Sequence, residues 1–589
     1  MTQSLDIERQ GDGSPSAGSS RIPFWRMVVD QAAITPEVTN YRYAGSGTAE
    51  DPFLVEWIPD DPRNPIFFSN PVKWFITIMV GIITLAVALV SSAYSGGIAQ
   101  IIQQFHIDRE VATLGVSLFV LGFAVGPLVW APLSELFGRQ VLFTGTFAAF
   151  TAFNGGCIAS QNPWTLIILR FLAGVFGSSP LTNAGGNIAD MFLASECGLA
   201  LSIFAAAPFL GPVLGPFMGG FLGMNAGWRW VMGFLATLTG VLWILGSLCV
   251  PETYAPILLR RRAARLSKTM GRCYVSGLDH SQGRVTFGES VKTALLRPWI
   301  LLFKEPIVLL LSIYMAIIYG TLYMLFGAFP IVYQEVRGWN QGVGGLAFLG
   351  TLVGMLLGVA YTILANKQYV RIEREHGGFA PPEARLPPAM VGSVALPIGL
   401  FWFAWTNSPS VHWMASVAAG APFGFGMVLV FISILNYLID AYTIFAASVL
   451  AANSVLRSCF GTAFPLFTTY MFDNLGIHWA SSIPAFLALL CVPLPFLFYR
   501  FGPTIRARCK FAAESAAFMQ RLQERPAVSE KDHKSVDGDI SPEREGPTFE
   551  PIIDSTSRAS IRTGASTGRR TYQANPYDVD RVNTRHSFT

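Results

Sequence analysis

Charged residues are scarce in this chain. Asp, Glu, Lys and Arg make up 13% of its 589 residues, whereas soluble domains contain about 25%. The shortage is concentrated in the middle, because nearly all the apolar residues lie between positions 74 and 499 and both ends are polar. The net charge of +4 is small and dispersed, so no nucleic-acid-binding surface is indicated. This composition indicates a protein that resides in a lipid bilayer.

Signatures of several other protein classes are missing as well. The seven cysteines are scattered and predict neither a disulfide framework nor a metal site. No phosphate-binding GxxxxGK[ST] loop is present, which argues against ATP-driven transport. There is no Ser/His/Asp constellation, Arg-rich voltage-sensor helix or filter-like segment, and residues 1–70 contain no apolar core of a cleavable signal peptide. We expect neither an enzyme nor a channel, and no catalytic residue, cofactor or metal.

The apolar region divides into twelve stretches of the right length for membrane spans. A helix needs about 20 apolar residues to cross the hydrocarbon core. The predicted spans, separated at charges, prolines and glycines, lie near 74–95, 112–131, 141–160, 164–188, 199–222, 228–250, 306–330, 343–365, 387–406, 411–437, 444–471 and 477–499. We therefore predict an all-α membrane protein with twelve transmembrane helices in two pseudo-symmetric six-helix halves.

A basic stretch separates the two sets of six spans and predicts the orientation. Residues 251–305 are rich in Lys and Arg, so the positive-inside rule makes this loop cytoplasmic. An even number of spans on each side then puts both termini in the cytoplasm. The predicted regions are a largely disordered cytoplasmic tail, an N-terminal half, a basic cytoplasmic loop, a C-terminal half and a second disordered cytoplasmic tail, over 1–70, 71–250, 251–305, 306–500 and 501–589.

Arg170 is the most conspicuous charge inside a predicted span. It lies in LIILRFLAGVFG, at a depth of about 9 Å from the outer end at ~1.5 Å per residue. Charges inside spans usually face a cavity or a partner, although a long Arg side chain also reaches the interface by snorkelling. An Arg cannot itself release a proton. It can hold a proton-accepting partner or a substrate by charge, and we favour that role over snorkelling.

Two further motifs stand out by their composition. The run GPVLGPFMGG contains Gly211, Gly215, Pro216, Gly219 and Gly220. Three of these glycines recur every four residues, which predicts a kinked helix with a smooth face for close packing.

The second motif, GPLVWAPLSELFGR, connects the second and third spans. Its candidate residues are Gly126, Pro132, Ser134, Glu135, Gly138 and Arg139. Glu135 and Arg139 are expected to pair with each other or with neighbouring helix ends, and thereby to lock one state of the transport cycle. The alternative is an ordinary polar loop.

Candidate substrate contacts lie in the second half. Tyr319, Tyr323 and Phe326 have the spacing of one helical face, and an aromatic face suits flat, apolar or cationic ligands. Lipid-facing or core aromatic residues have the same pattern. Asn436 and Arg457 are also candidates, although a role at a helix end or in topology fits them equally well.

Taken together, these motifs resemble the major facilitator superfamily, and within it the fungal twelve-spanner drug:proton antiporters, over roughly residues 51–512. Further segments that resemble this branch are Pro251–Leu259, Glu305–Pro306, Tyr319–Gly320, Gly399–Trp405, Asn436–Asp440 and Arg457–Ser458. The resemblance implies that Arg170 takes part in proton coupling and that Gly211–Gly220 is the antiporter motif. It also implies a fold whose halves rock about a substrate site at the bilayer midplane.

Three segments depart from the pattern of this branch. Gly327 stands where the seventh span often has a Glu, which favours neutral or anionic substrates over cations. Glu196 and Cys197 stand where the loop after the fourth span often carries Arg, and the C-terminal counterpart of the loop motif, 366–385, is degenerate.

The expected function is proton-driven export of a small apolar or amphipathic compound across the plasma membrane. That compound is a toxic drug or a fungal metabolite. The expected partners are the substrate, protons and lipid, and the chain is expected to act as a monomer. The alternatives are an exporter of polyamines or other cations, an importer of nutrients, which the fifth-span motif disfavours, and a non-transporting sensor on the same fold.

Overall fold

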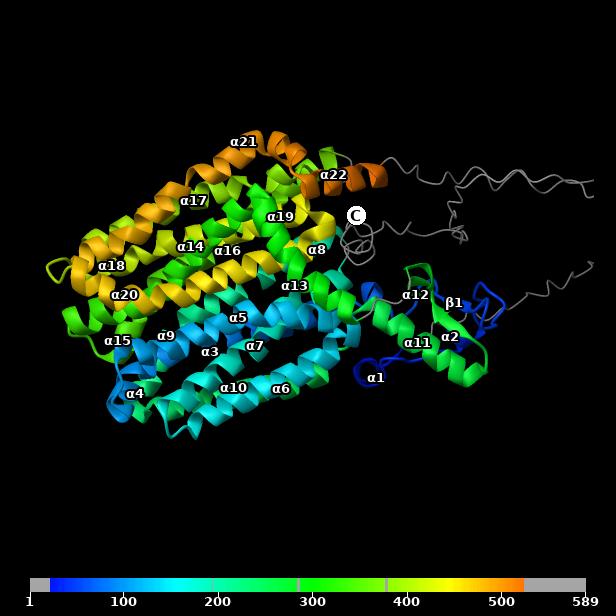
Figure 1. Ribbon diagram of the computed structural model, residues 1–589, viewed down its shortest axis with the longest axis horizontal. Coiled ribbons are helices and arrows are strands. Elements are labelled where there is room, and N and C mark those ends of the chain that lie inside the picture. Colours follow the sequence, from blue (N-terminus) through cyan, green and yellow to red (C-terminus); the bar gives the residue numbers. More distant parts are fainter. Residues whose placement is uncertain (1–21, 193, 283–286, 377–379, 524–589) are drawn as a thin grey trace, which may run out of the picture.

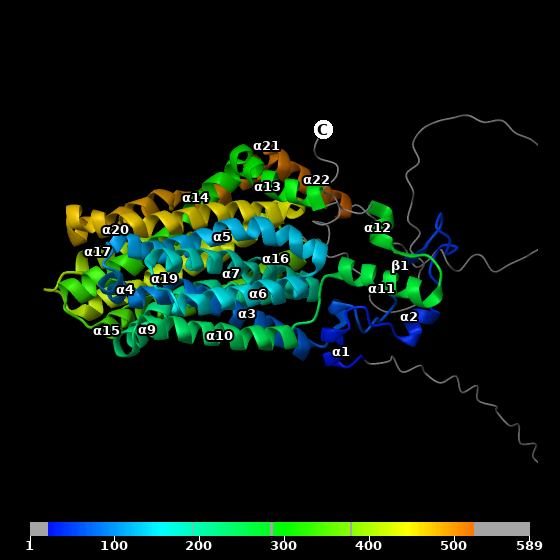
Figure 2. The same ribbon diagram turned by 60° about the horizontal axis from the view of Figure 1, so that its bottom comes forward.

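The long helices lie side by side in an elongated bundle (Figures 1 and 2). The computed structural model describes residues 22–192, 194–282, 287–376 and 380–523. A smaller group of elements, which includes α11 and β1, lies beyond one end of the bundle. We call this the basic end, because much of the Arg- and Lys-rich stretch 251–305 lies there, and we call the opposite one the far end.

The N-terminal half contains the first six spans. Its elements are α3 (Asn70–Ala93), the 3₁₀ helix η2 (Tyr94–Gly97), α4 (Ile98–Phe105), α5 (Arg109–Phe137), α6 (Arg139–Ile158), α7 (Pro163–Met191), α8 (Ala194–Phe204), α9 (Ala207–Ala226) and α10 (Trp228–Cys249). Local sequence explains several boundaries. The Asn162 side chain caps α7 by accepting a 2.7 Å hydrogen bond from the Thr165 amide, and Gly138 divides α5 from α6 with a φ of 98°.

The C-terminal half repeats this plan. Its elements are α14 (Pro306–Phe329), the π-helix η3 (Pro330–Val336), α15 (Gln341–Leu346), α16 (Phe348–Glu375), η4 (Pro382–Arg385), α17 (Pro387–Thr406), α18 (Trp413–Ala418), α19 (Gly420–Ala441), η5 (Thr443–Phe445), α20 (Ala446–Cys491) and α21 (Pro493–Arg508). A last helix, α22 (Lys510–Gln523), follows. α14 is the most deeply enclosed span, with nearly every side chain buried.

Eleven helical segments of the described chain are long and apolar enough to cross a membrane. The last of them covers Thr443–Arg508 and has 66 residues, whose ~100 Å of helix would exceed the ~30 Å core about threefold. Gly476, with φ 73° and ψ 165°, breaks its helical backbone. α20 accordingly turns back at the far end (Figure 1). This segment therefore supplies two crossings, which gives the twelve spans that the sequence predicts.

The segment before the first span is folded. We expected residues 1–70 to be largely disordered, and this is wrong for the described residues from Ile22 onward. They form α1 (Phe24–Val29), α2 (Pro36–Asn40), β1 (Phe53–Val55) and η1 (Pro65–Phe67). From the basic stretch, α11 (Ala255–Met270), β2 (Tyr274–Ser276) and α12 (Gly277–Gln282) join them at the basic end, whereas α13 (Phe287–Lys304) lies against α20 and α5 of the bundle.

Pairing between distant residues holds this segment in place. β1 and β2 pair in parallel, with Phe53 opposite Tyr274. A buried ion pair joins Asp61 to Arg262 of α11. The buried Arg63 donates hydrogen bonds to the carbonyl oxygens of Met27 and Glu252. Burial lowers the pKa of the Arg63 guanidinium to about 10, so it remains charged at neutral pH.

Candidate functional site

The glycine face of α9 packs on the first span. A Cβ atom at Gly215 would lie 1.9 Å from Oγ of Ser92, and one at Gly219 would lie 2.1 Å from the Ala93 carbonyl oxygen. Gly211 makes the same kind of approach to Leu85, where the distance would be 2.5 Å. These distances leave no room for any side chain, so the predicted smooth face provides close contact between α9 and α3.

The other side of the same motif contacts the second half. A Cβ atom at Gly220 would lie 2.7 Å from the Gln341 carbonyl oxygen of α15. The Pro216 carbonyl oxygen would be 2.6 Å from a Cβ atom at Gly345. α9 therefore lies at the interface between the two halves near the far end, where its backbone contacts the backbone of α15.

Arg170 is enclosed in the N-terminal half. It is 0% exposed, which excludes snorkelling. Its Nε donates a 3.0 Å hydrogen bond to the Gly115 carbonyl, and its two terminal nitrogens donate to the carbonyls of Val90 and Ser91 at 3.0 and 3.1 Å. The latter two belong to the last turn of α3, whose final carbonyls have no partner within the helix. Arg170 thus places a positive charge at a helix C-terminus, where the helix dipole favours it.

Two aromatic rings complete the enclosure of Arg170. Its guanidinium carbon lies 4.9 Å from the ring centroid of Tyr94 and 4.3 Å from that of Phe119. Gly115 makes room for this arrangement, because a Cβ atom there would lie 2.4 Å from the Tyr94 ring. We expected a proton-accepting partner or a substrate for Arg170. In the described residues, every hydrogen-bond acceptor that contacts this guanidinium is a backbone carbonyl.

Ser91 contacts both Arg170 and the second half, the first through its backbone carbonyl and the second through its hydroxyl. The Ser91 hydroxyl lies 2.9 Å from the Tyr323 hydroxyl, which in turn accepts a 3.4 Å hydrogen bond from Tyr319. Phe326 packs edge-to-face on Tyr323, with ring centroids 5.2 Å apart. The aromatic face predicted on the seventh span therefore exists, and it points toward the first span. All three of its rings are buried.

Arg457 lies at the other end of these contacts. It follows the start of α20 by eleven residues, about 17 Å along the helix at ~1.5 Å per residue. Its guanidinium carbon lies 4.8 Å from the ring centroid of Tyr319 and 5.9 Å from that of Phe431. The side chain is half-buried, and its Nε is buried without a hydrogen-bond partner. Asn436, the other polar candidate, is half-buried on α19.

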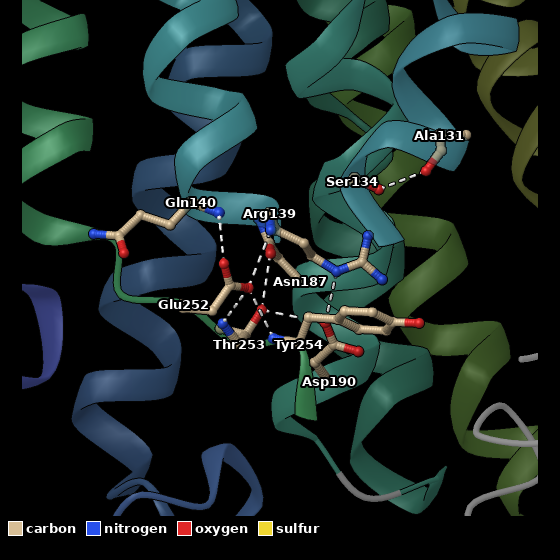
Figure 3. Close-up of polar contacts among 9 residues, drawn as sticks. All are labelled: Ala131, Ser134, Arg139, Gln140, Asn187, Asp190, Glu252, Thr253 and Tyr254. Carbon is tan, nitrogen blue, oxygen red and sulfur yellow. Dashed lines mark hydrogen bonds and ion pairs between the residues drawn. The ribbon is translucent and has the colours of Figure 1, made fainter. Parts of the chain in front are cut away.

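The loop motif forms a polar cluster at the basic end (Figure 3). Arg139 donates from Nε to Asp190 at 2.7 Å, and both side chains are buried. The guanidinium also lies over the Tyr254 ring, 5.2 Å from its centroid. Glu135 is exposed, and Arg139 pairs with Asp190 near the end of α7.

Glu252 organises this cluster. Its carboxylate accepts hydrogen bonds from the backbone amides of Arg139, Gln140, Thr253 and Tyr254, at 3.0 to 3.2 Å. It thereby satisfies free amides at the start of α6. Any Cβ atom at Gly138 would lie 2.3 Å from this carboxylate.

Thr253 extends the cluster to α7. Its hydroxyl donates to Asn187 at 2.9 Å and lies 3.2 Å from the Asp190 carboxylate. The Ser134 hydroxyl bonds to the Ala131 carbonyl at 2.8 Å, within its own helix (Figure 3).

The remaining residues of the loop motif serve packing. A Cβ atom at Gly126 would lie 1.8 Å from Oγ of Ser178, so α5 and α7 approach closely there. Pro132 is buried within α5.

The C-terminal half carries a corresponding cluster despite its degenerate sequence. Arg385 donates to Asp440 at 2.8 Å and lies over the Tyr369 ring, 3.3 Å from its centroid. Asp440 ends the tenth span as Asp190 ends the fourth. Glu383 accepts two hydrogen bonds from Arg506, at 2.8 and 2.9 Å. Each half therefore ties its helix ends together at the basic end with an Arg–Asp pair.

Comparison with known proteins agrees with this geometry. Residues 80–464 match the model of the Major Facilitator Superfamily. The chain is 64% identical to the major facilitator superfamily multidrug transporter mdrA of Aspergillus fumigatus, over 97% of this chain and 96% of that protein. It is 63% identical to the MFS-type efflux pump MFS2 of Trichophyton rubrum, over 96% of each.

The chain belongs to the major facilitator superfamily. A further relative is the efflux pump FUB11 of Gibberella moniliformis, 53% identical over 85% of this chain and 84% of that protein. Among solved structures, the superfamily's proton:xylose symporter XylE matches with a TM-score of 0.53 at 14% identity, over 74% of this chain and 96% of that one. This structural match supports the fold. The resemblance to fungal efflux transporters read from the motifs is confirmed.

The sequence alone does not reveal how several residues contribute to the site. Glu252 was visible only as part of the PETY segment, and its contact with Gly138 is not apparent from spacing. Ser91 is an ordinary small polar residue in an apolar span. Gly327, at the position where the branch often has a Glu, packs against Thr468, 3.3 Å from where its Cβ atom would lie.

Proposed function

We propose that this protein is a proton-coupled antiporter that exports a small apolar or amphipathic compound, a drug or a fungal metabolite, across the plasma membrane. The observation that carries this proposal is the identity of 63% or more, over at least 96% of the chain, with proteins named as a multidrug transporter and an efflux pump. Such proteins work by alternating access between two halves. We also propose that the chain acts as a monomer.

The orientation follows from charge. The basic end carries the Lys and Arg of the stretch 251–305, and the positive-inside rule makes it cytoplasmic. The first described element, α1, and the last, α22, both lie toward this end (Figure 1), in keeping with two cytoplasmic termini.

Alternating access requires contacts that form and break at each end. At the far end, Arg109 of α5 and Glu335 of η3 form a 2.6 Å ion pair between the halves, next to the close approach of α9 and α15. Opening outward separates these groups. At the cytoplasmic end, the pairs Arg139–Asp190 and Arg385–Asp440 lie within the halves, so each half moves as a rigid unit.

Proton coupling is assigned to Arg170 together with the carboxylates at the basic end. Arg170 cannot release a proton. Through its hydrogen bonds to the carbonyls of Val90 and Ser91, it holds the end of α3 against α7 within the N-terminal half. Asp190, which is buried, pairs with Arg139 in the N-terminal half, and the half-buried Asp440 pairs with Arg385 in the C-terminal half. Loss of either ion pair would free helix ends that the pair holds together, and would thereby change the relative stability of the two states.

The test is transport into inside-out plasma-membrane vesicles with and without a protonophore. We expect uptake that collapses when the gradient is abolished, and uptake that falls about tenfold or more in Asp190→Asn, because Arg139 loses its charged partner. Glu135→Gln, which removes an exposed carboxylate of the same motif, is the matched control and should transport normally. Uptake that ignores the gradient contradicts the antiport proposal. Gly327 disfavours a cation exporter, because it stands where the branch often has a Glu. An absence of any transport would favour a non-transporting sensor.

A further inference from the structure

We propose that the substrates of this transporter are aromatic organic acids in their anionic form, and that Arg457 binds their carboxylate. The proposal rests on the export function above and names the class of compound exported. It starts from the half-buried guanidinium that lies near the middle of the eleventh span.

The charge of Arg457 is not neutralised by the protein. In the described spans, every acidic residue lies within three residues of a span end or of the break at Gly476. Arg170, the other cation deep in a span, has its three hydrogen bonds to carbonyl oxygens. Arg457 has a buried Nε with no partner, and within the described chain it forms no ion pair or hydrogen bond. An isolated charge at this depth is costly unless it serves a ligand.

The aromatic side chains around Arg457 favour a ligand with a flat apolar ring. The rings of Tyr319 and Phe431 lie under the guanidinium, with centroids 6.3 Å apart. Phe431 also contacts Phe209 of α9, with centroids 4.7 Å apart. These rings come from the seventh, tenth and fifth spans, so the guanidinium lies where the two halves meet. A ligand held there would be released when the halves separate on the other side.

The chemistry of the two parts fits one ligand class. A guanidinium presents donors in a planar fork that matches a carboxylate bidentately. Aromatic side chains provide offset or edge-to-face contacts for an aromatic ring. Cations are disfavoured because Arg457 repels them and no carboxylate of the described span interiors offsets that repulsion. Gly327, where a Glu is common in this branch, adds no acidic group to the neighbouring span.

The test measures binding to the full-length protein in lipid nanodiscs by calorimetry, without a proton gradient. The probes are 1-naphthoate, the neutral 1-naphthamide and the cationic 1-naphthylmethylammonium, which share one ring system. We expect the wild-type protein to bind the carboxylate most tightly. Arg457→Gln should weaken naphthoate binding about tenfold or more and naphthamide binding less than about twofold. Arg457→Lys keeps the charge but loses the planar fork of donors, so its affinity for naphthoate should lie between those of the wild type and Arg457→Gln.

The control is Arg508→Gln, which removes the same charge from an exposed position at the end of α21 and should leave all three affinities unchanged. Retained naphthamide binding shows that Arg457→Gln is folded. If that variant does not fold, weaker naphthoate binding by Arg457→Lys tests the proposal instead. Equal affinity for carboxylate and amide, parallel losses in Arg457→Gln, preference for the cation, or no binding of any probe would each overturn the proposal. Uptake that ignores a protonophore would instead overturn the antiport mechanism and leave this assignment intact.

Discussion

Two arginines that lie deep in membrane spans, one in each half, are held in opposite ways. Arg170 is 0% exposed, and three of its nitrogens donate to carbonyl oxygens of two neighbouring spans. Arg457 is half-buried, and its buried Nε has no partner. Both lie over two aromatic rings. Both arginines have similar aromatic surroundings. The donors of Arg170 nevertheless have acceptors within the protein, whereas the buried Nε of Arg457 has none.

This difference separates structural and binding roles. A guanidinium whose donors are used by the protein stabilises the helices that supply the acceptors, and it has little left for a ligand. A guanidinium with free donors contributes little to the fold, but it can gain a charge-assisted hydrogen bond when an anion arrives. Contacts through Ser91, Tyr323 and Tyr319 run from Arg170 in one half to Arg457 in the other.

Replacement by alanine should show the largest contrast. Arg170→Ala removes three charge-assisted hydrogen bonds and leaves a cavity, so we expect a loss of stability of about 3 kcal/mol or more and loss of transport for every substrate. Arg457→Ala removes a charge that the protein does not neutralise, so we expect stability within about 1 kcal/mol of the wild type. Thermal unfolding of both purified variants measures this. Equal destabilisation would show that the two arginines are not held differently.

Hydropathy and charge predict much of the architecture but few of its contacts. The twelve spans follow from runs of apolar residues, since only helices can cross lipid in this length range. The folded segment from Ile22 was missed because its stability depends on pairs such as Asp61–Arg262, which are 201 residues apart. Short polar stretches carry no periodic signal for such partners.

The loop motif shows why spacing alone misleads. Glu135 and Arg139 are four residues apart, the separation at which side chains meet on a helix. Gly138 between them has a φ of 98°, so the two residues lie on different helices and Arg139 turns to Asp190 instead. Arg170 and Arg457 were both recognised as candidates. Their different hydrogen bonding depends on which carbonyls lie nearby in space, which the sequence does not reveal.

Glycines beside the two arginines should give a smaller contrast of the same kind. Gly115→Ala places a Cβ atom 2.4 Å from the Tyr94 ring that covers Arg170, and Gly461→Ala places one 3.0 Å from the Tyr319 ring below Arg457. Overpacking in an enclosed site costs about 1 to 3 kcal/mol, so Gly115→Ala should lower the unfolding temperature clearly. Gly461→Ala should change it less, because a contact at 3.0 Å is relieved by a smaller shift than one at 2.4 Å. Similar losses for both variants would mean that the site of Arg457 is as rigid as that of Arg170.

Removal of the hydrogen bond between the halves should have the smallest effect. Ser91→Ala and Tyr323→Phe each break the 2.9 Å contact that links the two arginines. Interhelical hydrogen bonds in membranes contribute about 0.6 kcal/mol on average, so we expect each single variant to change the vesicle uptake rate about two- to threefold. Both changes remove this shared bond, and each removes one further bond, from Tyr319 to Tyr323 or from Ser91 to Ala88, so the double variant should lose less than the sum of the two single losses. Tyr333→Phe, which breaks a 3.0 Å bond to Ser416 within the C-terminal half, is the control for loss of a tyrosine hydroxyl and should leave the rate nearly unchanged. Additive losses in the double variant would show that Ser91 and Tyr323 act separately, and the two arginines would then have to communicate by packing alone.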